Sequence, residues 1–273
     1  MSRDEISVAV DWAAAEGWNP GLDDAACFHA ADPDGFLVGT RDGGPVATIS
    51  AVRYGASFGF IGFYIVQPDR RGNGYGLRIW NAAMQRLDGR NIGLDGVVAQ
   101  QDNYRKSGFA LAWRNVRYEG VGGGRATDDA AIVPLATLPF AEVERYDRAF
   151  FPAQRGAFLK AWVGQPRATA IGLVERGTLR GVAVMRRCRS GCKIGPLFAD
   201  GPEIADRLFA RCRATAPQDA AVFLDIPQTN PHALELVERH GMQPMFETAR
   251  MYTRAVPALP VARMFGITSF ELG

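Results

Sequence analysis

Apolar and polar residues change their spacing several times along the chain, and each change predicts a new element. The apolar stretch from Phe58 to Val66 is typical of a buried strand, and it ends before Pro68, which cannot continue a backbone ladder. Beyond it, apolar residues recur at helical spacing, at Leu77, Trp80, Ala83, Met84 and Leu87. The pattern therefore predicts a strand, a short turn and an amphipathic helix.

The same reasoning predicts the elements on either side of this unit. Before it we expect two helices and a hairpin, over residues 4–16, 22–30, 35–40 and 45–54, with Asp42-Gly43 in the hairpin turn. After it we expect a strand, a short helix and a strand, over residues 92–99, 103–107 and 110–118. This order indicates an α/β (α+β) fold.

The second half of the chain repeats this order after a glycine-rich stretch, Gly120 to Asp129, which is typical of a linker. The pattern predicts a helical region, a hairpin and a strand over residues 140–163, 168–188 and 192–198, and then a helix, a strand over 222–226 and a helix over 231–240. Three pairs of glycines keep the same separation to within one residue: Gly43 and Gly177, Gly62 and Gly195, and Gly108 and Gly241. We therefore predict an internal duplication, with one domain over residues 1–125 and a second over 126–273.

Composition narrows the class of protein. The 273 residues, 47% apolar and 22% charged, suit a globular chain with room for two domains. A net charge of +2 does not indicate a nucleic-acid partner. No apolar run approaches the roughly 18 residues of a membrane helix, and the first residues lack a signal-peptide pattern. We expect a cytoplasmic protein that binds neither nucleic acid nor a membrane.

The four cysteines (Cys27, Cys188, Cys192 and Cys212) form no disulfide framework. Cys188 and Cys192 have the spacing of half a metal site, but no histidine lies near them in the sequence. We expect no metal.

The turn between the central strand and its helix carries alternating glycines, Gly72, Gly74 and Gly76, which let the backbone turn sharply with no projecting side chain. Free N–H groups and the helix dipole make such a turn an anion site that suits a pyrophosphate. A Walker loop is excluded, because Leu77-Arg78 follows Gly76 in place of Lys-Ser/Thr. An ordinary glycine turn is the alternative.

Arg71-x-x-Gly74-x-Gly76 resembles the Arg/Gln-x-x-Gly-x-Gly/Ala signature of the GCN5-related N-acetyltransferases (GNAT), which bind the pyrophosphate of coenzyme A. Tyr104 to Phe109 is similar to the family's Tyr-x-x-x-Gly-Phe, and residues 16–21 and 265–273 resemble a bacterial subgroup with two such domains. The resemblance implies two tandem GNAT-like domains, each with a mixed, mostly antiparallel central sheet flanked by helices. It also implies an N-acetyltransferase that moves an acetyl group from acetyl-coenzyme A, its cosubstrate, to a primary amine of a small molecule or amino acid.

The resemblance also implies which residues hold the cosubstrate. These cofactor-binding residues are Tyr64, Ile65, Val66, Arg71, Gly72, Asn73, Gly74, Tyr75, Gly76, Gln101 and Asn103. Gln100, Gln101 or Asn103 replaces an asparagine of the family pattern, because Val97 stands at that position here. Tyr104 is the expected acid that protonates the departing thiolate.

The acceptor side is expected in the segment that roofs the pocket in the family. Glu16 and Asp24 are candidate bases, although Asp23 or Asp24 could instead cap the second helix. We expect Trp18 and Asn19 to bind the substrate, with packing beneath the helices as the alternative for Trp18. His29 is a further candidate base, because histidine side chains ordinarily exchange protons near neutral pH, but a lone histidine is more often structural.

The second half departs from the family pattern. Its segment 196–203 lacks the alternating glycines and carries Asp200 and Glu203, which would repel a pyrophosphate, and Val237 stands in place of the tyrosine. We therefore expect a degenerate domain that does not bind coenzyme A and that either closes over the acceptor or forms the surface of a homodimer. Acetylation of protein lysines or N-termini, and a non-catalytic acyl-coenzyme A sensor, stay open as alternative functions.

Overall fold

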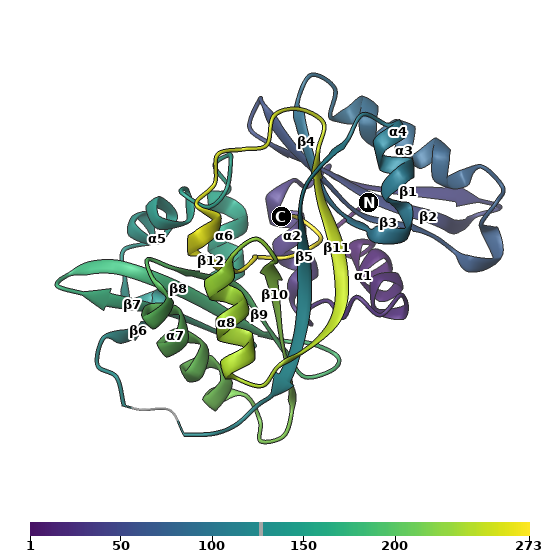
Figure 1. The fold of residues 1–273 in the computed structure, drawn as a ribbon. Helices are drawn as coiled ribbons and strands as arrows, with labels where there is room; N and C mark the ends of the chain where they lie inside the picture. The colour runs from purple at the N-terminus through teal and green to yellow at the C-terminus, as the bar shows by residue number, and fades with distance from the viewer. Residues whose placement is uncertain (126–127) are drawn as a thin grey trace.

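The computed structural model describes residues 1–125 and 128–273, and their helices and strands follow the predicted order (Figure 1). The first half contains α1 (Ile6–Ala15), α2 (Asp24–Ala31), β1 (Phe36–Arg41), β2 (Gly44–Tyr54), β3 (Phe58–Val66), α3 (Tyr75–Arg86), β4 (Asn91–Val97), α4 (Gln101–Lys106) and β5 (Ala110–Val121). The second half contains β6 (Ile132–Pro134), α5 (Phe140–Asp147), α6 (Gly156–Val163), β7 (Ala168–Glu175), β8 (Thr178–Arg187), β9 (Cys192–Ala199), α7 (Pro202–Thr215), β10 (Ala221–Pro227), α8 (Pro231–Arg239), β11 (Gln243–Tyr252) and β12 (Met264–Gly266).

Most predicted boundaries differ from these by a few residues, and three differences are larger. The helical region predicted over 140–163 is two helices, α5 and α6. Strands β6, β11 and β12 were not predicted at all. Leu77, predicted on the buried face of its helix, is 65% exposed, while its neighbours Ile79 and Trp80 are buried. The predicted domain border falls at residues 126–127, outside the described part of the chain.

The strands form a single 12-stranded sheet in the order β1-β2-β3-β4-β11-β5-β10-β9-β8-β7-β6, with β12 paired to β9. Within the described residues, only β3 with β4 and β9 with β10 pair in parallel. The sheet is therefore mixed and mostly antiparallel, as predicted, and helices flank it. None of the helices described here has the length and apolar character needed to cross a membrane.

The two halves exchange their last strands. Strand β11 of the second half pairs with β4 and β5 of the first half, and β5 of the first half pairs with β10 of the second. In Figure 1, β5 and β11 lie side by side along the middle of the molecule. Each half therefore completes the other half's sheet, and hydrogen bonds run without interruption across the junction.

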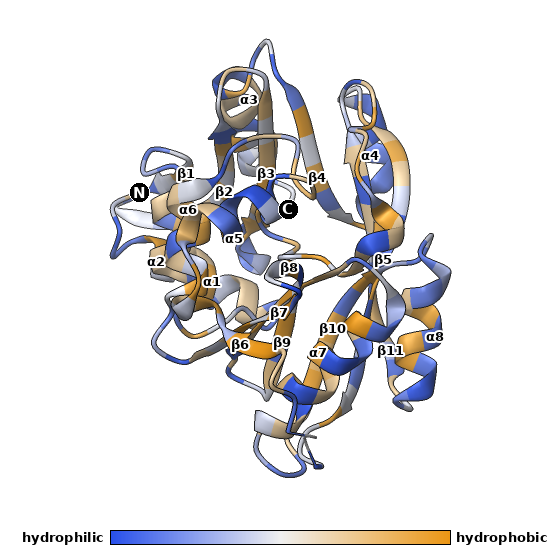
Figure 2. Cartoon of the chain, turned by 90° about the vertical axis from the view of Figure 1, so that its left-hand side faces the viewer, coloured by the Kyte–Doolittle hydropathy of each residue, from blue (hydrophilic) through white to orange (hydrophobic). Residues whose placement is uncertain are grey.

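The hydrophobic core also crosses this junction. Alternate residues of β3 face opposite sides of the sheet, with Phe60 packed in the cluster that includes α1 and α2 and Ile61 in the cluster beneath α3. The first of these clusters continues into the second half, where the ring of Phe28 lies 6.1 Å from that of Trp162 on α6. A further cluster lies beneath α7 and α8, against β9 and β10, which are coloured mostly as hydrophobic in Figure 2.

Both parallel pairs of strands separate before their ends. Pairing of β3 with β4 stops at Ile61 and Leu94, and pairing of β9 with β10 stops at Ile194 and Leu224. Residues 264–273, which we call the tail, enter the opening of the second half, where β12 pairs with β9 and the Ile267 N–H donates to the Asp225 carbonyl at 2.8 Å. In the first half, the space between the separated ends of β3 and β4 contains a cavity.

The tail passes close to two glycines that the duplication relates, Gly62 on β3 and Gly195 on β9. A Cβ at Gly62 would lie 2.0 Å from the carbonyl oxygen of Glu271, and one at Gly195 would lie 2.5 Å from that of Thr268. Neither backbone position can give way to a side chain, so both glycines are required for the tail to pass.

The strand exchange predicts that residues 1–125 do not fold alone. Without β11, strands β4 and β5 each lose an antiparallel partner, and their backbone groups are left at exposed edges. Expressed separately, residues 1–125 should aggregate, whereas co-expression with residues 128–273 should give a soluble pair that elutes together on size exclusion. A monodisperse 1–125 fragment with native-like circular dichroism would contradict this.

Candidate functional site

A cavity of about 520 Å³ lies in the opening between β3 and β4. One end is formed by the glycine turn and the start of α3, and the middle by β3, β4 and Tyr104. The other end is formed partly by the second half of the chain, through Phe246 and Thr248 of β11 and Phe270 and Glu271 of the tail. Both halves therefore build the wall of one cavity.

At the first end, the backbone leaves open space. Gly72 and Gly74 have φ angles of +79° and +77°, and a Cβ at either position would meet nothing within 4 Å. Gly74 is the N-cap of α3, and no side chain caps the first turn of this helix. Its N–H groups are therefore free to bind an anion. Gly76 is required for a different reason. A Cβ there would lie 2.7 Å from the Tyr64 hydroxyl, so only glycine leaves room for the Tyr64 side chain.

The residues around these glycines divide into those that line the cavity and those that hold the loop. The Asn73 amide donates to the carbonyls of Arg70 and Arg71 at 3.2 Å each, which holds the loop in its turn. Tyr75 points toward β1, where Arg41 donates to its hydroxyl, and it does not line the cavity. Asn73 does not line it either.

Arg71 and Glu16 meet at the rim of the cavity. Arg71 Nε donates to the Val66 carbonyl at 3.0 Å, and its Nη2 forms an ion pair with Glu16. Both residues line the cavity. The ion pair joins the glycine loop to the turn that follows α1.

A β-bulge shapes the wall that β3 presents. Ser50 pairs with Gly62 and Thr48 with Ile65, so β3 has one more residue than β2 across this step. Phe63 takes a φ of +48° there, which is uncommon for a residue other than glycine. The Thr48 hydroxyl donates to the Phe63 carbonyl at 3.0 Å. Residues Gly62 to Val66, which include the predicted Tyr64 and Ile65, line the cavity.

Tyr104 lies between the cavity and the core. It is 8% exposed, and its ring lies 5.6 Å from that of Trp80. Glycine is needed opposite it, because a Cβ at Gly96 would lie 2.2 Å from the ring. Burial raises the pKa of Tyr104 to about 12, and the nearby Tyr64 acts in the same direction. The hydroxyl therefore keeps its proton at neutral pH and can donate it.

Of the three candidates for the family's asparagine, only Gln100 lines the cavity. Asn103 donates to the Gln100 side chain at 2.7 Å and so holds it. Gln101 is buried elsewhere and accepts from Arg114 at 3.0 Å.

The turn after α1 is held in place by the second half. Trp18 lines the cavity, and its carbonyl accepts from Arg117 at 2.8 Å and from Lys193 at 3.1 Å. Asn19 lies outside the cavity, and its side chain donates to the Ser190 carbonyl at 2.8 Å. Asn19 therefore positions the turn that carries Trp18.

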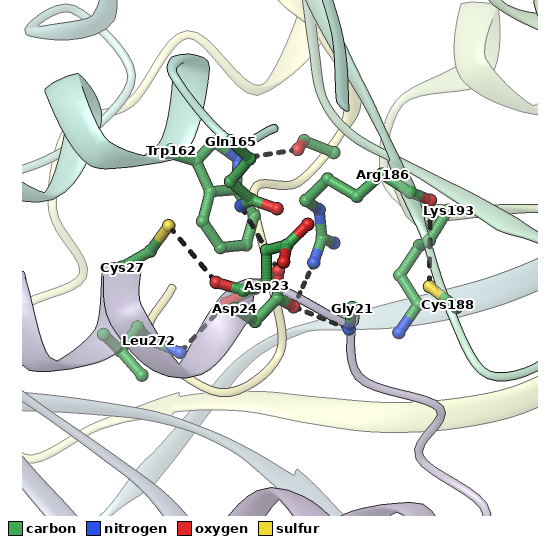
Figure 3. A network of polar contacts seen from close by, with 12 residues as sticks. Gly21, Asp23, Asp24, Cys27, Trp162, Gln165, Arg186, Cys188, Lys193 and Leu272 are labelled. Carbon is green, nitrogen blue, oxygen red and sulfur yellow. Dashed lines mark hydrogen bonds and ion pairs between the residues drawn. The ribbon is translucent and has the colours of Figure 1, made fainter. Parts of the chain in front are cut away.

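Asp24 lies outside the cavity, in a fully buried network at the junction of the halves (Figure 3). It forms an ion pair with Arg186 and accepts from the Gly21 N–H at 2.8 Å and from Gln165 at 3.3 Å. The Arg186 guanidinium lies 4.1 Å from the centre of the Trp162 ring. These contacts give Asp24 a structural role. Its carboxylate does not line the cavity, where a base for the acceptor would have to lie.

The cavity residues that come from β4, β11 and the tail were not among the predicted site residues. The side chain of Asp95 on β4 is fully buried, and its carboxylate accepts from Arg250 and Asn115 at 2.8 Å each. Burial raises the pKa of Asp95, and Arg250 opposes this shift. Polar and apolar residues alternate from Thr248 to Met251, which was a usable signal for a strand there, although not for which strands pair with β11.

No group of three or more His, Cys, Asp or Glu side chains within residues 1–125 and 128–273 is arranged to hold a metal ion.

Comparisons with known proteins match both halves. A model of the acetyltransferase (GNAT) family matches residues 5–110, and an acetyltransferase (GNAT) domain model matches residues 143–266. The holothin acyltransferase of Pseudoalteromonas sp. (strain SANK 73390) is 32% identical over 272 residues, which cover 100% of this chain and 92% of that protein.

Solved structures share the fold. A proposed acetyltransferase from Pyrococcus horikoshii superposes with a TM-score of 0.84 at 21% identity, covering 100% of this chain and 94% of that one. A tandem GNAT protein from the clavulanic acid biosynthesis pathway superposes with a TM-score of 0.62 at 15% identity, covering 94% of this chain and 98% of that one.

The buried network makes a prediction about stability. Arg186→Met keeps most of the apolar volume but leaves the Asp24 carboxylate buried without its cation, so we expect a loss of about 3–5 kcal/mol in the free energy of unfolding. Urea titration measures it. Arg189→Met, which removes one partner of the exposed ion pair with Asp11, is the control and should cost less than about 1 kcal/mol. Similar small losses in both variants would contradict the structural role.

Proposed function

The chain belongs to the acetyltransferase (GNAT) family and is an acyltransferase, and from this premise we propose that it transfers an acetyl group from acetyl-coenzyme A to the primary amine of a small molecule. The observation that carries the proposal is the open end of the cavity. Free N–H groups lie there beside Gly72 and Gly74, where a Cβ would meet nothing within 4 Å. An unpaired strand edge and Tyr104 adjoin this open space.

The residues present fit coenzyme A. Its pyrophosphate would bind the N–H groups of Gly72, Gly74 and the start of α3, because their φ angles and free donors suit a phosphate. Its pantetheine arm would pair with the backbone of Tyr64 to Val66, which has no partner on the β4 side. When bound, acetyl-coenzyme A supplies an activated thioester. Leu77, apolar and exposed beside the loop, offers a contact for the remainder of the molecule.

The chain's own groups then favour acyl transfer by direct attack. The cavity holds the amine and the thioester carbonyl together, which makes their reaction close to unimolecular. The amine nitrogen bonds to the carbonyl carbon while the carbon–sulfur bond breaks. Tyr104 donates a proton to the departing sulfur and regains one from water, and Glu16 is the proposed group that takes up the proton leaving the amine.

A small-molecule acceptor is supported by the aromatic side chains in the wall of the cavity, which include Trp18, Phe246 and Phe270. The relative that matches this chain over its whole length is a holothin acyltransferase. By analogy with its name, we propose a small molecule as the acceptor here. No comparable observation favours a protein acceptor or a sensor.

The glycine loop can be tested by Gly74→Val. A β-branched residue at a φ of +77° would be strained and would fill the space proposed for the phosphate, so calorimetry should detect no binding of coenzyme A. Gly89→Val is the control for strain alone, because Gly89 has a φ of +78° and open space but lies in the turn after α3, outside the cavity. Equal affinity in both variants would contradict the assignment.

Tyr104→Phe tests the acid. Thiol release from acetyl-coenzyme A across a panel of amines should fall about 10²- to 10⁴-fold, while coenzyme A affinity stays unchanged. Since the pKa of Tyr104 is about 12, the wild-type rate should not decline between about pH 7 and 10 through loss of this proton. Unchanged turnover in the variant would remove Tyr104 from this role, and binding without turnover of any amine would favour a sensor.

A further inference from the structure

Two buried polar atoms in the cavity wall have no hydrogen-bond partner among the described residues. They are Oε1 of Glu271 and Oγ1 of Thr248, and their residues are 4% and 2% exposed. An unpaired buried carboxylate oxygen is costly and calls for a ligand that offsets its desolvation. Both residues belong to the second half of the chain and line the cavity, and Glu271 packs against Gly62 of β3.

Glu271 is held in this position from both sides. Its own carbonyl packs against Gly62 of β3, where no side chain would fit. The next carbonyl, that of Leu272, accepts from the Tyr54 hydroxyl at 3.2 Å, and the Leu272 N–H donates to the Ser269 hydroxyl at 3.1 Å. Arg155 donates to the Thr268 hydroxyl at 2.9 Å. The backbone is therefore anchored, and the carboxylate is presented by a fixed segment.

The nearest cations are engaged with other groups. Arg117 forms a two-point ion pair with Asp225 at 2.7 and 2.8 Å, and Lys193 donates to the Trp18 carbonyl. Burial lowers the pKa of Lys193, Arg117 adds to this, and the charge of Glu271 acts in the opposite direction. These charges lie near the Glu271 carboxylate but leave its Oε1 without a donor.

Aromatic side chains line the same cavity as Glu271 and Thr248. The rings of Phe246 and Phe270 meet edge to face with centres 6.0 Å apart, and the Arg117 guanidinium covers Phe270 at 4.9 Å. Trp18 also lines the cavity, and its carbonyl accepts from the same Arg117 at 2.8 Å. A carboxylate and a hydroxyl among aromatic rings form a site that suits an alkylammonium group on an apolar body.

We propose that Glu271 and Thr248 bind the ammonium group of the acceptor, so that the acceptor is a cationic primary amine on an aromatic or apolar body without a carboxylate of its own. Before the transfer, the bound ammonium gives one proton to the Glu271 carboxylate, which passes it to water, and the neutral nitrogen then attacks. An uncharged analogue would leave the Glu271 oxygen unpaired, and an acceptor carboxylate placed beside Glu271 would be repelled by it. The inference rests on the proposed function for the identity of the reaction, but the binding site can be tested separately.

The test uses the full chain and three probes of similar shape: 2-phenylethylamine, 2-phenylethanol and phenylalanine. Calorimetry with and without coenzyme A should show that the amine binds at least about tenfold more tightly than the other two. Glu271→Gln should lose that preference, with amine affinity about tenfold weaker and coenzyme A affinity unchanged. Thr248→Val, of similar shape, should weaken the amine by a few-fold.

Glu247→Gln is the matched control, since this carboxylate lies next to Thr248 on β11 but is exposed and paired with Arg114. It should bind all three probes as the wild type does. Wild-type amine affinity in Glu271→Gln, or equal binding of amine and alcohol by the wild-type protein, would overturn the inference. Because the wild-type comparison needs no variant, it decides the question even if Glu271→Gln does not fold. A wild-type chain that binds the amine but not coenzyme A would count against the proposed function alone.

Discussion

The pairing of β5 with β11 is the interaction on which the rest of the structure depends. These strands run antiparallel in the centre of the sheet, and each also pairs with the half of the chain to which it does not belong. The exchange leaves β4 and β10 without the open edges that would otherwise face solvent or another chain. It also fixes where the second half lies relative to the first, because the register of a sheet cannot slide by one residue without turning every side chain over.

Buried ion pairs lie along this junction. The side chains of Arg117 with Asp225, Arg186 with Asp24 and Arg250 with Asp95 are all nearly or fully inaccessible, and each pair joins a residue of the first half to one of the second. Such pairs add little net stability, because desolvation offsets most of the attraction between the charges. Their effect here is on placement: a shift between the halves would leave one partner buried and unpaired. The pair of Arg250 with Asp95 fixes the position of β11 relative to β4 in this way.

The duplication produced two equivalent openings with different contents. In the second half the tail fills the space between β9 and β10, and in the first half the space between β3 and β4 is a cavity. The same tail then adds Phe270 and Glu271 to that cavity. One segment thus closes one opening and completes the other, which gives the second half a part in the site although its own loop lacks the glycines of the first.

Features that depend on neighbouring residues could be predicted from the sequence alone. Periodicity was sufficient for most helices and strands, and the glycine turn before α3 and the short helix that carries Tyr104 could be predicted because three or four adjacent residues shape each of them. Only the tertiary structure decided which strands pair and which distant side chains meet. Asp24 entered an ion pair with Arg186, and Glu271 reached a cavity built mainly by residues 61–104. Hydrophobic pattern encodes whether a residue is buried but not against what, so contacts between residues far apart in the chain are set by strand register and packing, which only the folded chain contains.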